Sequence, residues 1–286
     1  MMRLLSNVTI RQVLSRAGEM LATNNIEDPP LESELLLRHA LKIDRVQLYL
    51  ELDRQLSPDQ SEQFWLLVER RLNNEPSAYI VGYREFYGLD FYVDSSVLIP
   101  RPETELLVEN ALEFARRRPL STIADIGTGC GAIAISLALN LPQTKIYATD
   151  ISAAALKVAS ANCRKHSVAD RVSLLEGNML EPLPEPVDLL VANLPYVSEL
   201  ELSRVNTLGF EPSLALNGGP DGLEKIRRLC TQVKEKLHPG GCLLLEIGQG
   251  QGEAVTTFLG NLFPAARIEL IPDLSDIDRV VSLSCL

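Results

Sequence analysis

The chain has few of the features that mark membrane, secreted or nucleic-acid-binding proteins. Its 286 residues contain no apolar run near the roughly 18 residues of a membrane span, and residues 1–7 have no signal-peptide core. Lysine and arginine number 27 against 38 acidic residues, so the net charge is −11. Nonspecific binding to phosphates depends on basic side chains. We therefore expect a protein with no membrane segment and no direct nucleic-acid partner.

Cysteine and histidine are also scarce. The five cysteines are scattered without a close pair, at positions 130, 163, 230, 242 and 285. This spacing is typical of reduced thiols in the cytoplasm and not of disulfides or zinc sites. The three histidines, 39, 166 and 238, are too few and too scattered for a metal site or a catalytic triad. We expect no metal.

The length suggests two domains, and the patterning changes along the chain. Apolar residues recur at helical spacing up to about residue 75, and Ser57 to Gln60 carry the signature of a helix start. Residues 76–97 contain two β-rich segments, Tyr79–Tyr83 and Leu89–Val93, which predict a hairpin linker. We expect a helical recognition domain at 1–75, the linker at 76–97, and a second domain at 98–286.

The second domain alternates strands with helices, which predicts an α/β fold with a doubly wound, mostly parallel, seven-stranded sheet. The expected strands are 123–126, 145–149, 172–175, 187–192, 242–247, 267–271 and 279–283. Helices are expected after residue 105, at 132–139, 153–165, 223–237 and 253–263, with a loop from the fourth strand to about Asp221.

A glycine-rich loop joins the first of these strands to its helix. It comprises Gly127, Thr128, Gly129, Cys130 and Gly131, and glycines allow backbone to approach a ligand at a helix start. Asp150 ends the next strand, where an acid accepts hydrogen bonds from ribose hydroxyls. Both features suit NAD enzymes as well as proteins that bind S-adenosyl-L-methionine. Met179 ends the third strand, where it packs on an adenine ring or fills core.

The decisive stretch follows the fourth strand and reads Asn193-Leu194-Pro195-Tyr196. Pro195 forces an extended conformation on Leu194, so the Leu194 carbonyl can be held beside the Asn193 side chain. Two acceptors and a neighbouring ring can hold a planar NH2 group at the edge of the sheet where ligands collect. This tetrad favours an amino- or amide-nitrogen methyltransferase. A plain turn and a nicotinamide enzyme are the alternatives.

Several longer blocks occur in order along the chain. They are EPSAYIVGYREFYGLDFYVD (75–94), LIPRPETE (98–105), DIGTGCGAIAI (125–135), VDLLVANLPY (187–196), EPSLALNGGPDGL (211–223) and LLEIGQGQ (244–251). Together they resemble the peptide chain release factor N5-glutamine methyltransferases, a family of class I S-adenosylmethionine-dependent enzymes. The likeness covers nearly the whole chain and is weakest over the first seventy residues.

The resemblance implies methyl transfer from S-adenosyl-L-methionine to the glutamine side chain of the Gly-Gly-Gln motif of release factors. It implies that Gly127 to Gly131, Asp150, Met179 and Asn193 contact the cofactor, and that Asn193, Leu194, Pro195 and Tyr196 hold the glutamine. The helical domain would contact the release factor, and we expect a cytoplasmic monomer. The usual tetrad has proline where this chain has Leu194. Asn-Leu-Pro-Tyr also occurs in ribosomal RNA adenine dimethyltransferases, so RNA or DNA adenine N6-methylation is the alternative.

Overall fold

The computed structural model describes residues 8–204 and 209–284. Cys285 and the first seven residues, which entered the expectations about thiols and a leader, lie outside this part. The chain divides into two compact units, one ending at Gly82 and one beginning at Tyr83. No helix in the described part is both long enough and apolar enough to cross a membrane.

The first unit is helical, as the periodicity predicted. Its helices are α1 (Ile10–Thr23), α2 (Pro29–Leu41), α3 (Arg45–Leu50), α4 (Pro58–Leu72) and α5 (Ser77–Val81). Helix α4 begins with the expected capping box, in which Ser57 Oγ accepts from Gln60 N–H and Gln60 Oε1 accepts from Ser57 N–H. The unit buries one face of each main helix, with Ile10, Leu36, Leu37 and Phe64 fully buried.

The strand expected at Tyr79–Tyr83 was wrong. Residues Ser77–Val81 form helix α5, which ends at Gly82 in the left-handed conformation with φ of 80°. Ile80 and Val81 favour strands by propensity, but they are buried in the helical unit together with Ala78. Burial against neighbouring helices therefore overrides local β-propensity here.

The hairpin itself begins at Tyr83 and pairs β1 (Tyr83–Phe86) with β2 (Leu89–Tyr92). Its two-residue turn has positive φ at both positions, 53° at Tyr87 and 71° at Gly88. Such a turn matches the natural twist of paired strands. The hairpin therefore belongs to the second unit. Asn162 of helix α8 (Ala153–Lys165) holds it there by accepting from Tyr92 N–H and donating to the Tyr92 carbonyl.

The second unit contains a seven-stranded sheet in the order β5-β4-β3-β6-β7-β9-β8, in which only β9 runs antiparallel to its neighbours. This confirms the predicted doubly wound, mostly parallel fold. The strands are β3 (Thr122–Ile126), β4 (Lys145–Asp150), β5 (Val172–Glu176), β6 (Val187–Ala192), β7 (Leu237–Glu246), β8 (Arg267–Pro272) and β9 (Asp278–Ser284).

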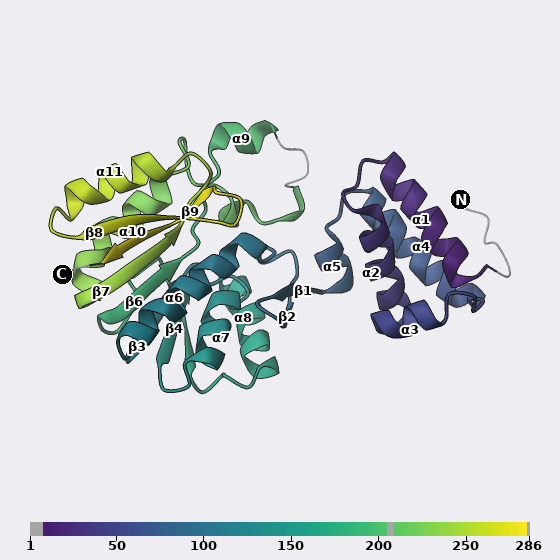
Figure 1. Cartoon of the computed structure of the whole chain (residues 1–286), viewed down its shortest axis with the longest axis horizontal. Coiled ribbons are helices and arrows are strands. Elements are labelled where there is room, and N and C mark those ends of the chain that lie inside the picture. Colours follow the sequence, from purple (N-terminus) through teal and green to yellow (C-terminus); the bar gives the residue numbers. More distant parts are fainter. Residues whose placement is uncertain (1–7, 205–208, 285–286) are drawn as a thin grey trace. The chain divides into compact units, whose positions relative to one another are not determined.

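Helices cover both faces of this sheet (Figure 1). Helices α6 (Glu105–Arg117), α7 (Ala132–Asn140) and α8 (Ala153–Lys165) pack on one face, and α10 (Glu224–Lys236) and α11 (Gly252–Leu262) on the other. The segment predicted as a loop before Asp221 contains the short helix α9 (Glu199–Arg204), which has no buried residue and so no apolar pattern to predict it.

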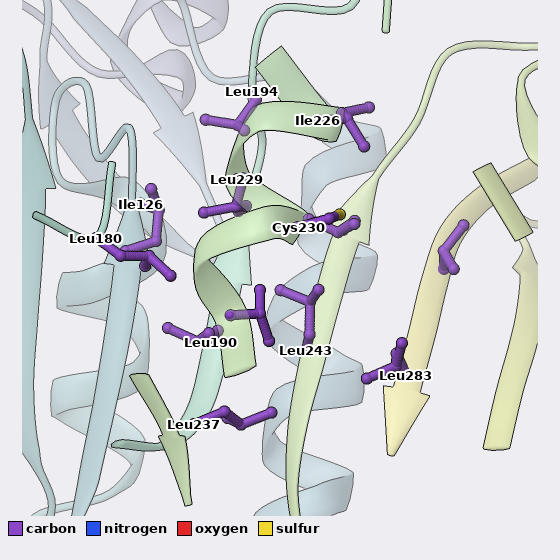
Figure 2. Packing of buried hydrophobic residues seen from close by; sticks show 14 of the residues in the cluster. Ile126, Leu180, Leu190, Leu194, Ile226, Leu229, Cys230, Leu237, Leu243 and Leu283 are labelled. Carbon is purple, nitrogen blue, oxygen red and sulfur yellow. The ribbon is translucent and has the colours of Figure 1, made fainter. Parts of the chain in front are cut away.

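The hydrophobic core between the sheet and α10 includes Leu194 and so fixes the position of the tetrad. Alternate residues of the central strands, such as Ile126, Leu190 and Leu243, meet Ile226 and Leu229 of α10 (Figure 2). Leu194 belongs to the same buried cluster. Strand β6 is buried at every position, as its continuous apolar run predicted.

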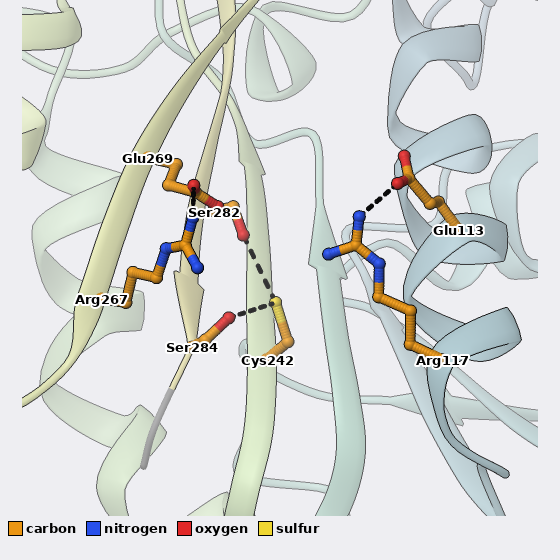
Figure 3. A network of polar contacts seen from close by, with 7 residues as sticks. All are labelled: Glu113, Arg117, Cys242, Arg267, Glu269, Ser282 and Ser284. Atoms are coloured by element: carbon orange, nitrogen blue, oxygen red, sulfur yellow. Dashed lines mark hydrogen bonds and ion pairs between the residues drawn. The ribbon is translucent and has the colours of Figure 1, made fainter.

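Strands β7 and β9 are joined by side-chain contacts as well as by backbone hydrogen bonds. Cys242 on β7 lies 3.6 Å from the Ser282 hydroxyl and 3.8 Å from that of Ser284, both on β9 (Figure 3). The ion pairs Arg267–Glu269 and Arg117–Glu113 in the same view are exposed. Exposed pairs of this kind contribute little to stability.

Candidate active site

The site lies where the winding of the sheet reverses. Strand β3 has β4 on one side and β6 on the other, so the connections that follow β3 and β6 leave in opposite directions. Open α/β sheets bind ligands at this point, beyond the carboxyl ends of the strands. The glycine loop follows β3 and the tetrad follows β6, so the fold brings together two motifs that are about sixty residues apart in the sequence.

The glycine loop adopts backbone conformations that favour glycine. Gly127, Gly129 and Gly131 have φ of 72°, 56° and 85°. A Cβ at Gly127 would lie 3.3 Å from Leu194 Cδ2, so this glycine also allows the loop to approach the tetrad. The N–H groups of Gly127 and Thr128 both donate to the Thr149 carbonyl, each at 2.9 Å, and attach the loop to β4.

Asp125 supports the loop from beneath and is fully buried. Its Oδ2 accepts from the Thr128 hydroxyl at 2.6 Å and from Ala134 N–H at 3.2 Å. The pKa of Asp125 is raised to about 7, mainly by burial and to a lesser extent by the nearby charge of Asp150, although the two hydrogen bonds lower it. The only sequence signal for this role was its place two residues before Gly127.

Asp150 ends β4 and lines the cavity. Its Oδ2 accepts from Gly129 N–H and its Oδ1 from Ser152 N–H, both at 2.9 Å. Burial raises its pKa, and these backbone donors lower it. The carboxylate is held rigidly at the cavity wall and retains lone pairs that can accept from hydroxyl groups of a ligand.

The cavity has a volume of about 220 Å³. Seven of the predicted residues form part of its wall: Gly127, Gly129, Asp150, Met179, Asn193, Leu194 and Pro195. Four lie outside the wall: Thr128, Cys130, Gly131 and Tyr196. Gly131 is the N-cap of helix α7, and the Thr128 hydroxyl donates inward to Asp125. Gly131 and Thr128 therefore help to maintain the shape of the glycine loop without lining the cavity.

Cys130 is buried rather than exposed to the cavity. Burial raises the pKa of its thiol to about 12, and burial also raises that of Cys163 to about 11. Neither thiol is therefore a ready nucleophile. The Cys130 carbonyl accepts from Asn162 Nδ2 at 2.9 Å, which connects the glycine loop to the residue that holds the hairpin. Sequence reasoning missed Asn162.

Met179 stands at the predicted end of the cavity, after β5. Its backbone has φ of 53°, and its carbonyl accepts from the Thr149 hydroxyl at 3.0 Å. Its side chain packs partly against the core. Gly177, Asn178 and Ala155 complete this largely apolar part of the wall, which suits a flat aromatic ligand group.

The Asn193 side chain is oriented by one hydrogen bond. Its Nδ2 donates to Thr104 Oγ1 at 3.0 Å. Thr104 ends the 3-10 helix Pro102–Thr104 of the LIPRPETE block and is itself buried. Because the NH2 end of the amide is engaged, Oδ1 remains the atom available to accept a hydrogen bond from a ligand at the cavity.

Leu194 belongs to both the core and the cavity wall. Its side chain is buried in the core with α10 and reaches the glycine loop at Cδ2, and the residue lines the cavity just before Pro195. Leucine at this position therefore fills hydrophobic space and keeps the carbonyl that the tetrad requires. Tyr196 lies deeper, where its hydroxyl donates to Glu246 Oε1 at 3.3 Å and its carbonyl accepts from Gln251 Nε2 at 3.0 Å.

Glu246 is a site residue that sequence reasoning missed. It is the last residue of β7 and is 2% exposed. Its pKa is raised to about 7, mainly by burial, although hydrogen bonding, including that of the Tyr196 hydroxyl, lowers it. Burial also raises the pKa of Tyr196, as does the neighbouring charge of Glu246. The apolar run Leu243–Leu245 that ends in a glutamate was the only signal for this position.

An ion pair between the buried Glu211 and the partly exposed Arg101 joins two other parts of the cavity wall. Glu211 accepts from Arg101 Nη2 at 2.6 Å and from Ile99 N–H at 3.2 Å. Two groups of cavity-lining residues flank this ion pair in the sequence. They are Ser96, Val97 and Leu98, which precede Arg101, and Pro212, Leu214 and Ala215, which follow Glu211. Thus the LIPRPETE and EPSLALNGG blocks form one wall.

Solved structures share the fold of the second unit. The catalytic domain of hMettl16, bound to an RNA hairpin of the MAT2A 3′UTR, matches with a TM-score of 0.57 at 18% identity, over 77% of this chain and 82% of its own. A methyltransferase from Pyrococcus furiosus matches with a TM-score of 0.50 at 16% identity, over 76% and 96%. The fold is that of the class I methyltransferases.

Sequence comparisons specify the family. Residues 12–82 match the PrmC N-terminal domain and residues 102–208 the methyltransferase small domain. A release factor glutamine methyltransferase from Moorella thermoacetica is 44% identical over 95% of this chain and 97% of its own length. One from Geobacter sulfurreducens is 43% identical over 96% and 95%. The chain belongs to the release factor glutamine methyltransferase family.

Proposed function

We propose that this protein transfers the methyl group of S-adenosyl-L-methionine to the side-chain amide nitrogen, N5, of the glutamine in the Gly-Gly-Gln motif of peptide chain release factors. Family membership supports the reaction. The observation that carries it is the Asn193 amide, whose NH2 end is bound by Thr104 so that its oxygen is left to accept from a substrate NH2 group.

The residues around the cavity fit the cofactor. The Asp150 carboxylate would accept from ribose hydroxyls, Met179 would pack beside the adenine, and Gly127, Gly129 and Asn193 would line the methionine portion. Thr128, Cys130 and Gly131 would hold the loop in shape from behind. When bound, S-adenosyl-L-methionine supplies a methyl group on a positively charged sulfur.

Asn193 and Leu194 would orient the glutamine amide. An amide nitrogen shares its lone pair with its carbonyl, so it is a poor nucleophile. Asn193 Oδ1 and the Leu194 carbonyl accept from its two N–H groups, which fixes the nitrogen in place and stabilises positive charge that develops on it. Pro195 restrains the Leu194 carbonyl, and Tyr196, anchored by Glu246 and Gln251, contributes the ring that flanks the amide.

The helical part of the chain would recognise the body of the release factor. We assign recognition to the helical unit that ends at Gly82, and catalysis to the unit that begins with the hairpin at Tyr83. The net charge of −11 supports a protein substrate over a nucleic acid. The protein acts as a monomer in the cytoplasm.

Mass spectrometry of a release factor after incubation with the protein and S-adenosyl-L-methionine tests this function. We expect one added methyl group on the glutamine of Gly-Gly-Gln, and none on a substrate with asparagine at that position. Labelled cofactor offered separately to RNA and DNA tests the alternative. Label in adenine with none in the release factor would contradict the proposal.

A further inference from the structure

The tetrad follows β6 without continuing the sheet. Residues 193–196 form neither helix nor strand, and Pro195 has no N–H group to donate. Within residues 8–204 and 209–284, no backbone N–H donates to the Tyr196 carbonyl. The partner of this carbonyl is a side chain, because Gln251 Nε2 donates to it at 3.0 Å. A single side-chain amide therefore fixes the direction of the Tyr196 carbonyl.

Gln251 is the N-cap residue of helix α11, and its side-chain amide is bound at both ends. Its Oε1 accepts from Gly248 N–H at 2.9 Å, while Nε2 donates to Tyr196. Its backbone N–H also donates to the Gly248 carbonyl at 3.1 Å, which closes the turn after β7. Because Gly248 binds the oxygen end of the amide, the NH2 end is directed at Tyr196. The turn after β7 thus orients Gln251, and Gln251 orients the tetrad.

Two glycines make room for this contact. A Cβ at Gly222, which has φ of 77°, would lie 2.3 Å from the Tyr196 carbonyl oxygen and 2.8 Å from Gln251 Nε2. A Cβ at Gly248 would lie 3.1 Å from Tyr196 Cδ2. A side chain at Gly222 would therefore displace the tyrosine, and one at Gly248 would crowd its ring. Tyr196 is packed between the segment before α10 and the turn after β7.

The segment before α10 also holds the residues on either side of Tyr196. Val197 N–H donates to the Leu216 carbonyl at 3.1 Å, and Gly218 N–H donates to the Val197 carbonyl at 2.9 Å. A Cβ at Gly218 would lie 2.8 Å from the Pro195 carbonyl oxygen. Pro195 lines the cavity. The packing around Tyr196 therefore continues to the wall of the site.

We propose that Gln251 is a positioning residue for methyl transfer, and that its NH2 group holds the Tyr196 carbonyl and thereby fixes the tetrad beside the substrate amide. This inference rests on the proposed methylation of an amide nitrogen. Gln251 and its hydrogen-bond partners, Gly248 and Tyr196, lie outside the wall of the cavity. Gln251 therefore acts through Tyr196 and not by contact with the cofactor.

Two replacements of similar size separate the donated hydrogen bond from packing. Gln251→Glu keeps an oxygen that accepts from Gly248 N–H but, as a carboxylate, has no hydrogen to donate to the Tyr196 carbonyl. Gln251→Leu neither donates nor accepts. We expect both to lower kcat on release factor about 10- to 100-fold at pH 8, because a small displacement of a positioned group costs about this much. The KM for release factor and the dissociation constant of S-adenosylhomocysteine should each change less than about threefold.

Protonation of the introduced glutamate gives a signature that packing alone does not produce. A protonated carboxyl group can donate to the Tyr196 carbonyl again. The kcat of Gln251→Glu should therefore rise about three- to tenfold relative to that of Gln251→Leu as pH falls from 8 to 5. The other charged groups near this contact are common to both variants, so the ratio of the two kcat values removes their own titration. They are Glu246 on β7, Asp278 and Arg279 on β9, Glu253 on α11, Arg101, and Asp221 and Glu224 beside the glycines before α10.

Gln249 offers a matched control in the same turn. It is exposed, lies two residues before Gln251 and does not line the cavity. Gln249→Glu introduces the same charge, and we expect its kcat and its pH profile to match those of the unaltered protein. A Gln251→Glu variant as fast as Gln249→Glu at pH 8 would overturn the inference. So would a Gln251→Glu variant that follows Gln251→Leu at every pH.

A readout without substrate keeps this inference separate from the proposed function. With 13C in the tyrosine carbonyls and 15N in valine, only Tyr-Val pairs give signals in an HNCO spectrum. The sequence has two such pairs, Tyr92–Val93 and Tyr196–Val197. Asn162 Nδ2 donates to the Tyr92 carbonyl, so that pair is an internal reference bound by a different amide. Val197→Ile assigns the second pair by loss of its signal.

The Tyr196 carbonyl signal reports the contact directly. We expect it to move upfield in Gln251→Leu at every pH, and in Gln251→Glu at pH 8 with a return as pH falls, while the Tyr92 signal stays in place. If these shifts occur but release factor is not methylated, the proposed function is wrong and the positioning by Gln251 is right. A Tyr196 signal that is the same in both variants and in the unaltered protein would overturn the inference.

Discussion

Asn193 shows how a single hydrogen bond determines the orientation of a side-chain amide. An amide can donate from one end and accept at the other, and its chemistry in a site depends on which end faces the ligand. Here Thr104 binds the NH2 end at 3.0 Å and leaves the oxygen for the cavity. The neighbouring Leu194 likewise belongs both to the hydrophobic core and to the wall of the cavity.

Removal of the Asn193 amide should affect turnover far more than cofactor binding. Asn193→Ala deletes a preorganised acceptor, so we expect kcat on release factor to fall about 100- to 1,000-fold. The dissociation constant of S-adenosylhomocysteine, measured by calorimetry, should rise only a few-fold. Turnover within tenfold of the unaltered protein would show that Asn193 does not orient the substrate.

Asp150 should behave in the opposite way. Asp150→Ala removes the carboxylate that the structure holds at the cavity wall through Gly129 and Ser152. Hydrogen bonds to charged groups contribute about 1.5–3 kcal/mol, so we expect cofactor affinity to fall about 10- to 100-fold. Saturating cofactor should restore most of kcat. A calorimetric titration that matches the unaltered protein would exclude contact between Asp150 and the ribose.

At the scale of elements, single side chains lock neighbouring segments together. Glu211 joins the two blocks that form one wall of the cavity. Asp188, on β6 at the end far from the site, accepts from the N–H groups of Ser121 and Thr122 at the start of β3, and from His238 Nδ1 on β7. These contacts align β3 and β6, the two strands whose following loops form the site.

Replacement of Asp188 should therefore weaken the fold. Burial alone would raise its pKa, but hydrogen bonds from His238, Thr122 and Ser121 lower it below its ordinary value of 3.8. A depressed acid pKa stabilises the folded state above pH 3.8, and this contribution is lost as pH falls below the folded-state value. Asp188→Ala leaves backbone N–H groups without an acceptor and should reduce the unfolding free energy by about 1–3 kcal/mol in urea at pH 7.

The charge-dependent part of the predicted loss should decrease as pH falls through the folded-state pKa of Asp188, which lies below 3.8. Asp188→Asn is the control, because its amide oxygen can still accept from the backbone. An unfolding free energy equal in Asp188→Ala and the unaltered protein would mean that the aspartate does not align these strands.

At the scale of the whole molecule, two buried carboxyl groups make stability depend on pH in the sense opposite to that of Asp188. Burial raises the pKa of Glu246 and of Asp125 to about 7, from ordinary values of 4.5 and 3.8. The folded protein therefore binds more protons than the unfolded chain between about pH 4 and pH 7. Stability is full below this range and declines as pH rises through it. We expect a lower Tm at pH 8 than at pH 5.5.

Glu246→Gln should remove its part of this decline. A shift from 4.5 to about 7 corresponds to an upper limit of about 3 kcal/mol, so the variant should be more stable than the unaltered protein at pH 8 and equal to it near pH 4. Calorimetric Tm values across this range measure it. A lower Tm for the variant at pH 8 would contradict this account.

Local sequence patterns determined much of this protein's fold and of its site. Alternating strands and helices predicted the doubly wound sheet, because each pattern reflects the faces that must be buried. The glycine loop and the tetrad were predictable because their chemistry lies in adjacent residues: positive φ in the loop, and a proline that fixes the preceding carbonyl. Short local patterns failed at α5, where burial in the helical unit outweighed the β-propensity of Ile80 and Val81.

Only the tertiary structure decided which distant residues support the tetrad. Thr104, Glu246 and Asn162 come from three separate segments, and no spacing rule connects them to Asn193 or to the glycine loop. Their roles depend on burial and on hydrogen-bond direction, which exist only once β6, β7 and the LIPRPETE segment are adjacent. The residues that perform the chemistry were therefore readable in the sequence, whereas those that orient them became visible only in the folded chain.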